Sequence, residues 1–125
     1  MKLEYLSEGS PDSPLIRLYS FTLREVLRLK ERVDNLSTGE LSEIALHKEP
    51  GVEPIDGCEF QLKLGDRDRG IVQITPVHFE CALSNEGWID VSCLLEPFCE
   101  PDATGFQWLV DKGPISLLIS VKGTW

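Results

Sequence analysis

The chain has 125 residues, and its 21 acidic and 12 basic residues give a formal net charge of −9. This length fits one domain with a core that needs neither a metal ion nor a disulfide to fold. A strongly acidic chain is a poor match for nucleic acid or for an anionic membrane, because both attract basic surfaces. We therefore expect neither of these partners.

The first residues lack the basic start and the apolar run of a signal peptide. No apolar run in the chain approaches the ~20 residues that a membrane-spanning helix needs. The four cysteines (Cys58, Cys81, Cys93 and Cys99) have no framework spacing. We therefore expect a cytoplasmic protein with reduced thiols.

Residues 1–14 are polar and include Gly9, Pro11 and Pro14, a composition that predicts a flexible N-terminal arm. Residues 15–125 are then expected to form a single α+β domain. Its first element is a short strand over Leu15–Tyr19.

The strongest local signal predicts a helix that starts after Thr22. Thr22 and Glu25 have the spacing of a capping box, and Gly39 suits a left-handed helix end. The apolar face is predicted to contain Val26, Leu29, Val33 and Leu36, widened by Leu23 and Leu27. The helix is expected to be long and to lie across a sheet.

The stretch from Cys58 to Ser84 predicts three consecutive strands. Residues 58–64 and 78–84 alternate apolar and polar positions, with Cys58, Phe60, Phe79 and Cys81 facing inward. Three of the residues 71–74 (Ile71, Val72 and Ile74) are β-branched, which favours a strand. Pro76 should end that strand or place it at a sheet edge. With a charged hairpin loop over 65–70, the stretch is expected to be an antiparallel meander.

The remaining segments give weaker patterns. Residues 41–47 favour a strand, and residues 48–57 favour a loop because of their prolines and glycines. Residues 88–96 fit a helix and a strand equally well; Asn85 as a cap and Pro97 as a stop favour a short helix. Residues 106–110 should form a strand, and the apolar run 115–121 should form a central strand buried on both faces. The expected fold is α+β: a mainly antiparallel sheet of about five to seven strands, one long helix and a second short helix.

No residue set carries a recognisable catalytic, cofactor or metal motif. The sequence lacks nucleotide-binding glycine loops, the nucleophile elbow and zinc-ligand spacings. His47 and His78 belong to no motif, and His78 is expected on a surface. Charges within 65–70 are expected to pair with one another on an exposed loop. We therefore predict no catalytic residue, no cofactor and no metal site.

Arginines at positions 24, 28 and 32 form a ridge along the predicted helix. The ridge could dock an acidic partner or a second copy's acidic segment, although Glu25 and Glu31 are nearer candidate partners. Aromatic residues gather late in the chain, and tryptophan is enriched in cores and at binding surfaces. The late aromatic residues are Trp88, Phe98, Phe106, Trp108 and Trp125.

The stretch between Ile71 and Val110 holds six acidic residues and no lysine or arginine. This pattern favours a small protein-binding module with a basic protein partner, for example an immunity-type inhibitor that neutralises a basic toxin. The alternative is a small enzyme or ligand-binding protein with a pocket among the late aromatic residues. The candidate partner-binding residues are Glu86, Asp90, Glu96, Glu100 and Asp102.

Overall fold

The computed structural model describes all residues 1–125 and contains two α-helices and nine strands. The helices are α1 (Leu23–Thr38) and α2 (Asn85–Leu95). The strands are β1 (Lys2–Leu6), β2 (Leu15–Tyr19), β3 (Glu43–Ala45), β4 (Glu53–Pro54), β5 (Glu59–Leu64), β6 (Gly70–Gln73), β7 (His78–Leu83), β8 (Phe106–Val110) and β9 (Ser116–Ser120). Neither helix has the length and apolar character that crossing a membrane requires.

The strands form two mixed sheets, so the fold is α+β as predicted, but the sheet is not mainly antiparallel. The first sheet has the order β4-β1-β2-β9-β8, and the second has the order β3-β5-β7-β6. Parallel pairs join β1 to β4, β2 to β9 and β5 to β7; the other pairs are antiparallel. The predicted five to seven strands in one sheet are therefore replaced by nine strands in two sheets.

The predicted meander is wrong, although its three strands exist. β5 pairs in parallel with β7, and β6 lies on the outer side of β7. β7 gains a neighbour on each side, which suits its buried Phe79 and Cys81, whereas Val72 of β6 is exposed. Pro76 follows β6 and cannot donate a ladder hydrogen bond, which agrees with the edge position that we predicted. Because β5 and β6 are not neighbours, residues 65–70 do not form a hairpin loop.

Helix α1 begins with the predicted capping box. The Glu25 amide donates to Thr22 Oγ1 (3.2 Å), and the Thr22 amide donates to Glu25 Oε1 (2.9 Å). Val26, Leu29, Val33 and Leu36 are buried, and Gly39 ends the helix in the left-handed conformation. Two details differ from the prediction: α1 has 16 residues and is not long, and Leu23 and Leu27 are exposed.

Residues 88–96, which fitted both templates, lie mostly in helix α2. The N-cap is Ser84 and not Asn85, because Ser84 Oγ accepts a hydrogen bond from the Gly87 amide (3.2 Å). Helix α2 ends at Leu95, and a 3₁₀ turn, Glu96–Phe98, contains Pro97. The strands expected over 41–47, 106–110 and 115–121 correspond to β3, β8 and β9, and β9 is buried and central.

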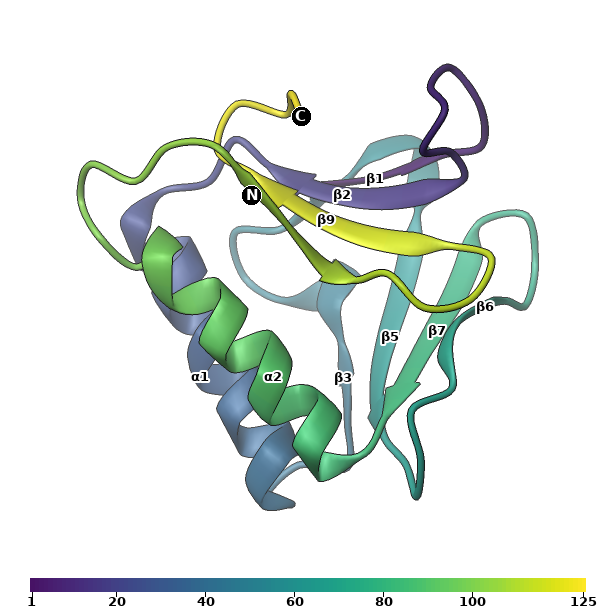
Figure 1. Ribbon diagram of the computed structural model, residues 1–125, viewed down its shortest axis with the longest axis vertical. Coiled ribbons are helices and arrows are strands. Elements are labelled where there is room, and N and C mark those ends of the chain that lie inside the picture. Colours follow the sequence, from purple (N-terminus) through teal and green to yellow (C-terminus); the bar gives the residue numbers. More distant parts are fainter.

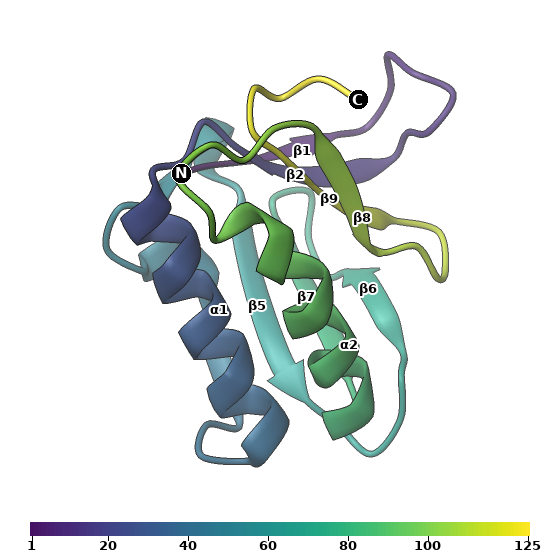
Figure 2. The same ribbon diagram turned by 60° about the vertical axis from the view of Figure 1, so that its left-hand side comes forward.

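The two helices lie side by side, run in opposite directions and face both sheets (Figures 1 and 2). The core lies between these layers, and Trp88 of α2 is fully buried there. Tyr5 of the first sheet contacts Phe79 of the second, with ring centroids 4.4 Å apart. The two sheets therefore share one core.

The segment 1–14, for which we expected a flexible arm, contains strand β1. Leu3 is fully buried, and β1 pairs with β2 from Lys2 to Leu6. Met1 and residues 7–14 are the parts of this segment that lie outside a strand. Alternation of Leu3 and Tyr5 with polar residues was the signal that the prediction overlooked. Strand β1 is therefore part of the first sheet, and residues 7–14 connect it to β2.

Candidate functional site

All five candidate acidic residues are exposed, and none of them takes part in an ion pair. Glu86 and Asp90 are four residues apart on α2 and therefore share one helix face. Glu96 starts the 3₁₀ turn after α2, and Glu100 and Asp102 lie in the loop that follows. We call these five carboxylates the acidic surface. No lysine or arginine of the chain neutralises them by direct contact.

Apolar groups interrupt the acidic surface on α2. Ile89 is 46% exposed and lies beside Asp90, and Cys93 is also exposed. An exposed branched side chain among unpaired carboxylates is a combination that suits contact with another protein, since interface centres are apolar and rims are charged. The sequence prediction named the carboxylates but missed Ile89.

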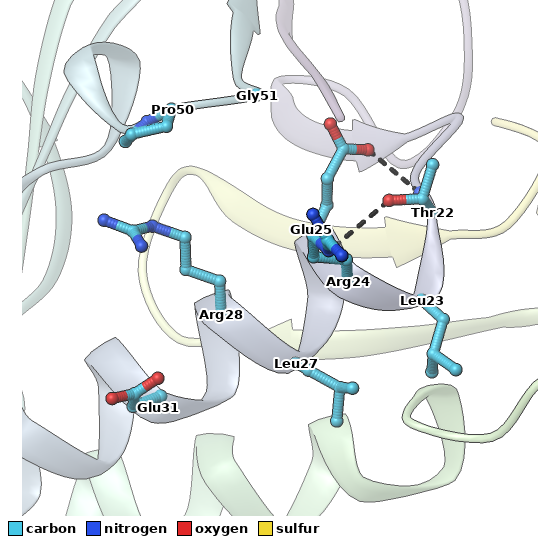
Figure 3. A pocket seen from close by; sticks show the side chains of 9 residues that line it. All are labelled: Thr22, Leu23, Arg24, Glu25, Leu27, Arg28, Glu31, Pro50 and Gly51. Atoms are coloured by element: carbon cyan, nitrogen blue, oxygen red, sulfur yellow. Dashed lines mark hydrogen bonds between the residues drawn. The ribbon is translucent and has the colours of Figure 1, made fainter.

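An open groove of about 730 Å³ runs along the outer side of α1 (Figure 3). Its lining residues are Thr22, Leu23, Arg24, Glu25, Leu27, Arg28, Glu31, Pro50 and Gly51. Seven of the nine belong to the helix or its cap, so the groove is largely the exposed helix face. None of the late aromatic residues lines it.

Some of the charged side chains that line this groove already make contacts within the protein. Burial alone would raise the pKa of Glu25, but hydrogen bonds from the Met1 amine and from Thr22 lower it below its usual value. The Met1 amine lies 2.8 Å from Glu25 Oε1 and also donates to the Gly51 carbonyl. The carboxylate of Glu25 is therefore occupied by contacts within the protein and is not available to a ligand. Arg24, in contrast, takes part in no ion pair.

The arginine ridge has a partner that the sequence did not indicate. Arg32 Nε lies 2.7 Å from Glu49 Oε1, and Arg28 Nε lies 3.8 Å from the same oxygen. Neither Glu25 nor Glu31, the expected partners, pairs with these arginines. Glu49 lies in the loop after β3, so only the tertiary fold could reveal this contact.

The two histidines, far apart in the sequence, meet at one carboxylate. His47 Nε2 lies 3.9 Å from Glu59, and His78 Nδ1 lies 3.8 Å from the other oxygen of Glu59. The Nδ1 atom of His47 accepts a hydrogen bond from the Phe60 amide (3.0 Å), which leaves Nε2 toward Glu59. No group of three or more His, Cys, Asp or Glu side chains is arranged to hold a metal ion. His78 lies at the start of β7 and His47 lies in the 3₁₀ turn after β3, and neither lines the groove.

The four cysteines are free thiols in distinct environments. Cys58 and Cys81 are buried on inward strand positions, Cys99 is half-buried and Cys93 is exposed. Burial raises the pKa of Cys58 to about 11 and that of Cys81 to about 12. Since the thiolate is the reactive form, these two thiols are unreactive near neutral pH.

We expect an alkylating reagent at neutral pH to modify Cys93 first and to modify Cys58 and Cys81 only slowly. Mass spectrometry of peptides from timed aliquots measures the order, and labelling of all four cysteines in denaturant is the control. Labelling of Cys58 or Cys81 as fast as Cys93 would contradict the burial described here.

The late aromatic residues do not converge on one pocket. Trp88 and Phe98 are buried, and Phe106 is exposed at the edge strand β8. Trp88 lines an apolar cavity of only about 10 Å³, and Phe98 lines a different cavity of about 80 Å³. The indole of Trp125 donates to Asp12 (2.9 Å). Each of these two cavities is therefore lined by only one of the late aromatic residues.

The charged loop over residues 65–70 contacts the start of helix α2. Asp68 Oδ1 accepts hydrogen bonds from the Ser84 amide (2.9 Å) and the Ser84 hydroxyl (2.8 Å), and these bonds lower the pKa of Asp68. A Cβ atom at position 87 would collide with the Asp68 carboxylate, so Gly87 permits this approach. Within the loop, Asp66 and Arg69 lie 3.9 Å apart as the expected internal pair.

Comparisons with known proteins identify no relative of this chain. No family model, curated protein or solved structure matches the chain. The fold and the site define a two-sheet α+β protein with an unpaired acidic surface.

Proposed function

We propose that this protein is a binding module that docks a basic protein through the acidic surface on α2 and the loop after it. The observation that carries the proposal is that all five carboxylates are exposed and without an ion-pair partner. Ile89, which is exposed on the same helix as Glu86 and Asp90, supplies apolar contact area. An immunity-type inhibitor of a basic toxin is one protein of this kind.

The charge pattern has a defined physical consequence. Exposed charges of one sign accelerate encounter with an oppositely charged partner and disfavour wrong partners more than they add affinity. The stretch from Ile71 to Val110 holds no lysine or arginine, so positive charge near it comes from other segments, as with Lys112 near Asp90. Such a surface selects a basic protein patch.

The experiment is affinity capture from a lysate of the source cells with three matched baits. The first is the unaltered protein, and the second is the acid-reversed variant E86K/E96K/E100K. The third is the control variant E8K/E40K/E53K, which reverses three exposed and unpaired acids outside the acidic surface. The two variants have the same net charge, so a difference between them reports position and not total charge.

We expect the unaltered protein and the control variant to retain the same basic protein, identified by mass spectrometry, and the acid-reversed variant to lose it. Thermal unfolding of all three baits verifies that they are folded. Equal retention by all three baits, or loss from both variants, would contradict a specific role for the acidic surface.

A further inference from the structure

A second, smaller cavity lies beside the acidic surface, between α2, β8 and the loop that joins β5 to β6. Its volume is about 170 Å³. Apolar side chains form one part of its wall, namely Leu83, Val91, Leu94, Leu109 and Val110. Three carboxylates and one ammonium group form the other part, namely Asp68, Asp90, Asp111 and Lys112.

The three carboxylates of this cavity differ in the hydrogen bonds and ion pairs that they make. Asp68 holds two hydrogen bonds from Ser84 and lies 3.7 Å from the Lys112 ammonium. Asp90 and Asp111 take part in no ion pair. Lys112 is mostly exposed, and its approach to Asp68 shows that the rim attracts a cation. One cation therefore faces three carboxylates, and two carboxylates have no partner.

The lining restricts the chemistry of a ligand. A neutral apolar ligand would cover carboxylates without compensating them, which costs free energy. An anion would be repelled, and the side chains are not arranged to coordinate a metal ion. A side chain with an apolar stem and a cationic head matches both parts of the wall. Arginine fits better than lysine, because its planar guanidinium has five donors and can serve more than one carboxylate.

We propose that this cavity receives an arginine side chain of the protein partner, with the stem against Leu94 and Leu109 and the guanidinium at Asp90 and Asp111. The inference rests on the proposed function, since Asp90 belongs to the acidic surface as well as to the cavity. Arginine anchors in pockets commonly dominate the binding energy of an interface. The cavity would be such an anchor point.

The test is an NMR titration of the isotopically labelled protein with N-acetyl-arginine methylamide. The matched ligand is the citrulline analogue, which has nearly the same shape but no charge. We expect saturable shifts at the amides of Gly87, Val91, Leu94 and Leu109 with arginine and none with citrulline. Equal shifts with both ligands, or shifts elsewhere only, would overturn the proposal.

Two variants separate the cavity from the rest of the acidic surface. D90N/D111N removes the two unpaired carboxylates at nearly constant shape and should abolish the saturable shifts. E86Q/E96Q removes two carboxylates outside the cavity and should leave the saturable shifts unchanged. All four substituted residues are exposed, and a well-dispersed NMR spectrum verifies that each variant is folded. Retention of arginine binding by D90N/D111N would contradict the assignment.

The same variants distinguish failure of this inference from failure of the proposed function. If the captured basic protein binds D90N/D111N as tightly as the unaltered protein while E86K/E96K/E100K loses it, the cavity is not the anchor and the proposed function stands. If arginine binds in the cavity but no basic protein depends on the acidic surface, the cavity stands and the proposed function fails.

Discussion

Trp88→Ala is expected to lower the free energy of unfolding by about 3–5 kcal/mol, the usual cost of removing a large aromatic side chain from a core. Trp88 is fully buried and lies where the helices meet both sheets. It lines a cavity of about 10 Å³ together with Leu29 of α1, Leu62 of β5 and Leu117 of β9. Because both helices and both sheets converge there, the surroundings have little freedom to collapse into the vacated space.

The indole also makes a specific polar contact. Its Nε1–H donates to the Lys63 carbonyl of β5 at 2.9 Å. Trp88→Phe keeps an aromatic ring but leaves that carbonyl without this partner, at a cost of about 1–3 kcal/mol. Urea unfolding followed by circular dichroism measures both variants. A Trp88→Ala midpoint equal to that of the unaltered protein would contradict the central packing described for Trp88.

Local signals in the sequence were sufficient for most elements and for their buried faces. The Thr22 and Glu25 pair located the start of α1 because both partners of a capping box lie within one turn. Phe60 and Phe79 were assigned inward because alternation depends only on adjacent residues. Exposure of Leu23 and Leu27 was missed, since helical spacing defines a stripe but not its width.

Partners of the strands could not be inferred in the same way. The alternation of 58–64 and 78–84 fits an antiparallel meander and the observed parallel pair equally well. The side-chain period specifies the buried face and not the neighbouring strand. The separation into two sheets depends on the core that they share, including the contact between Tyr5 and Phe79, and no local pattern encodes that contact.

For the candidate site, the sequence indicated the carboxylates but not their surroundings. The absence of lysine and arginine between Ile71 and Val110 can be read directly from the sequence. Glu86 and Asp90, which lie in this stretch, are exposed. The cavity beside Asp90 needs Asp68 and Asp111, which come from two other segments. Likewise, His78 reaches Glu59 because β5 pairs in parallel with β7, whereas His47 reaches it from the 3₁₀ turn after β3, the other neighbour of β5.

The association rate with the captured basic partner is expected to be at least about tenfold lower for E86K/E96K/E100K than for the unaltered protein. Reversal replaces long-range attraction at the docking surface by repulsion. The dissociation rate should change less, because rim charges act mainly on encounter. E8K/E40K/E53K has the same net charge and should lose much less of the rate, since its reversals lie outside the acidic surface.

The most direct test of the acidic surface is the association rate of these three proteins, measured by surface plasmon resonance across a range of NaCl concentrations. The rate of the unaltered protein should fall steeply as added salt shortens the Debye length to about 8 Å at physiological ionic strength and below that at higher salt. The rate of E86K/E96K/E100K should start low and change little or rise with salt. Association rates that are independent of both salt and charge reversal would contradict docking through the acidic surface.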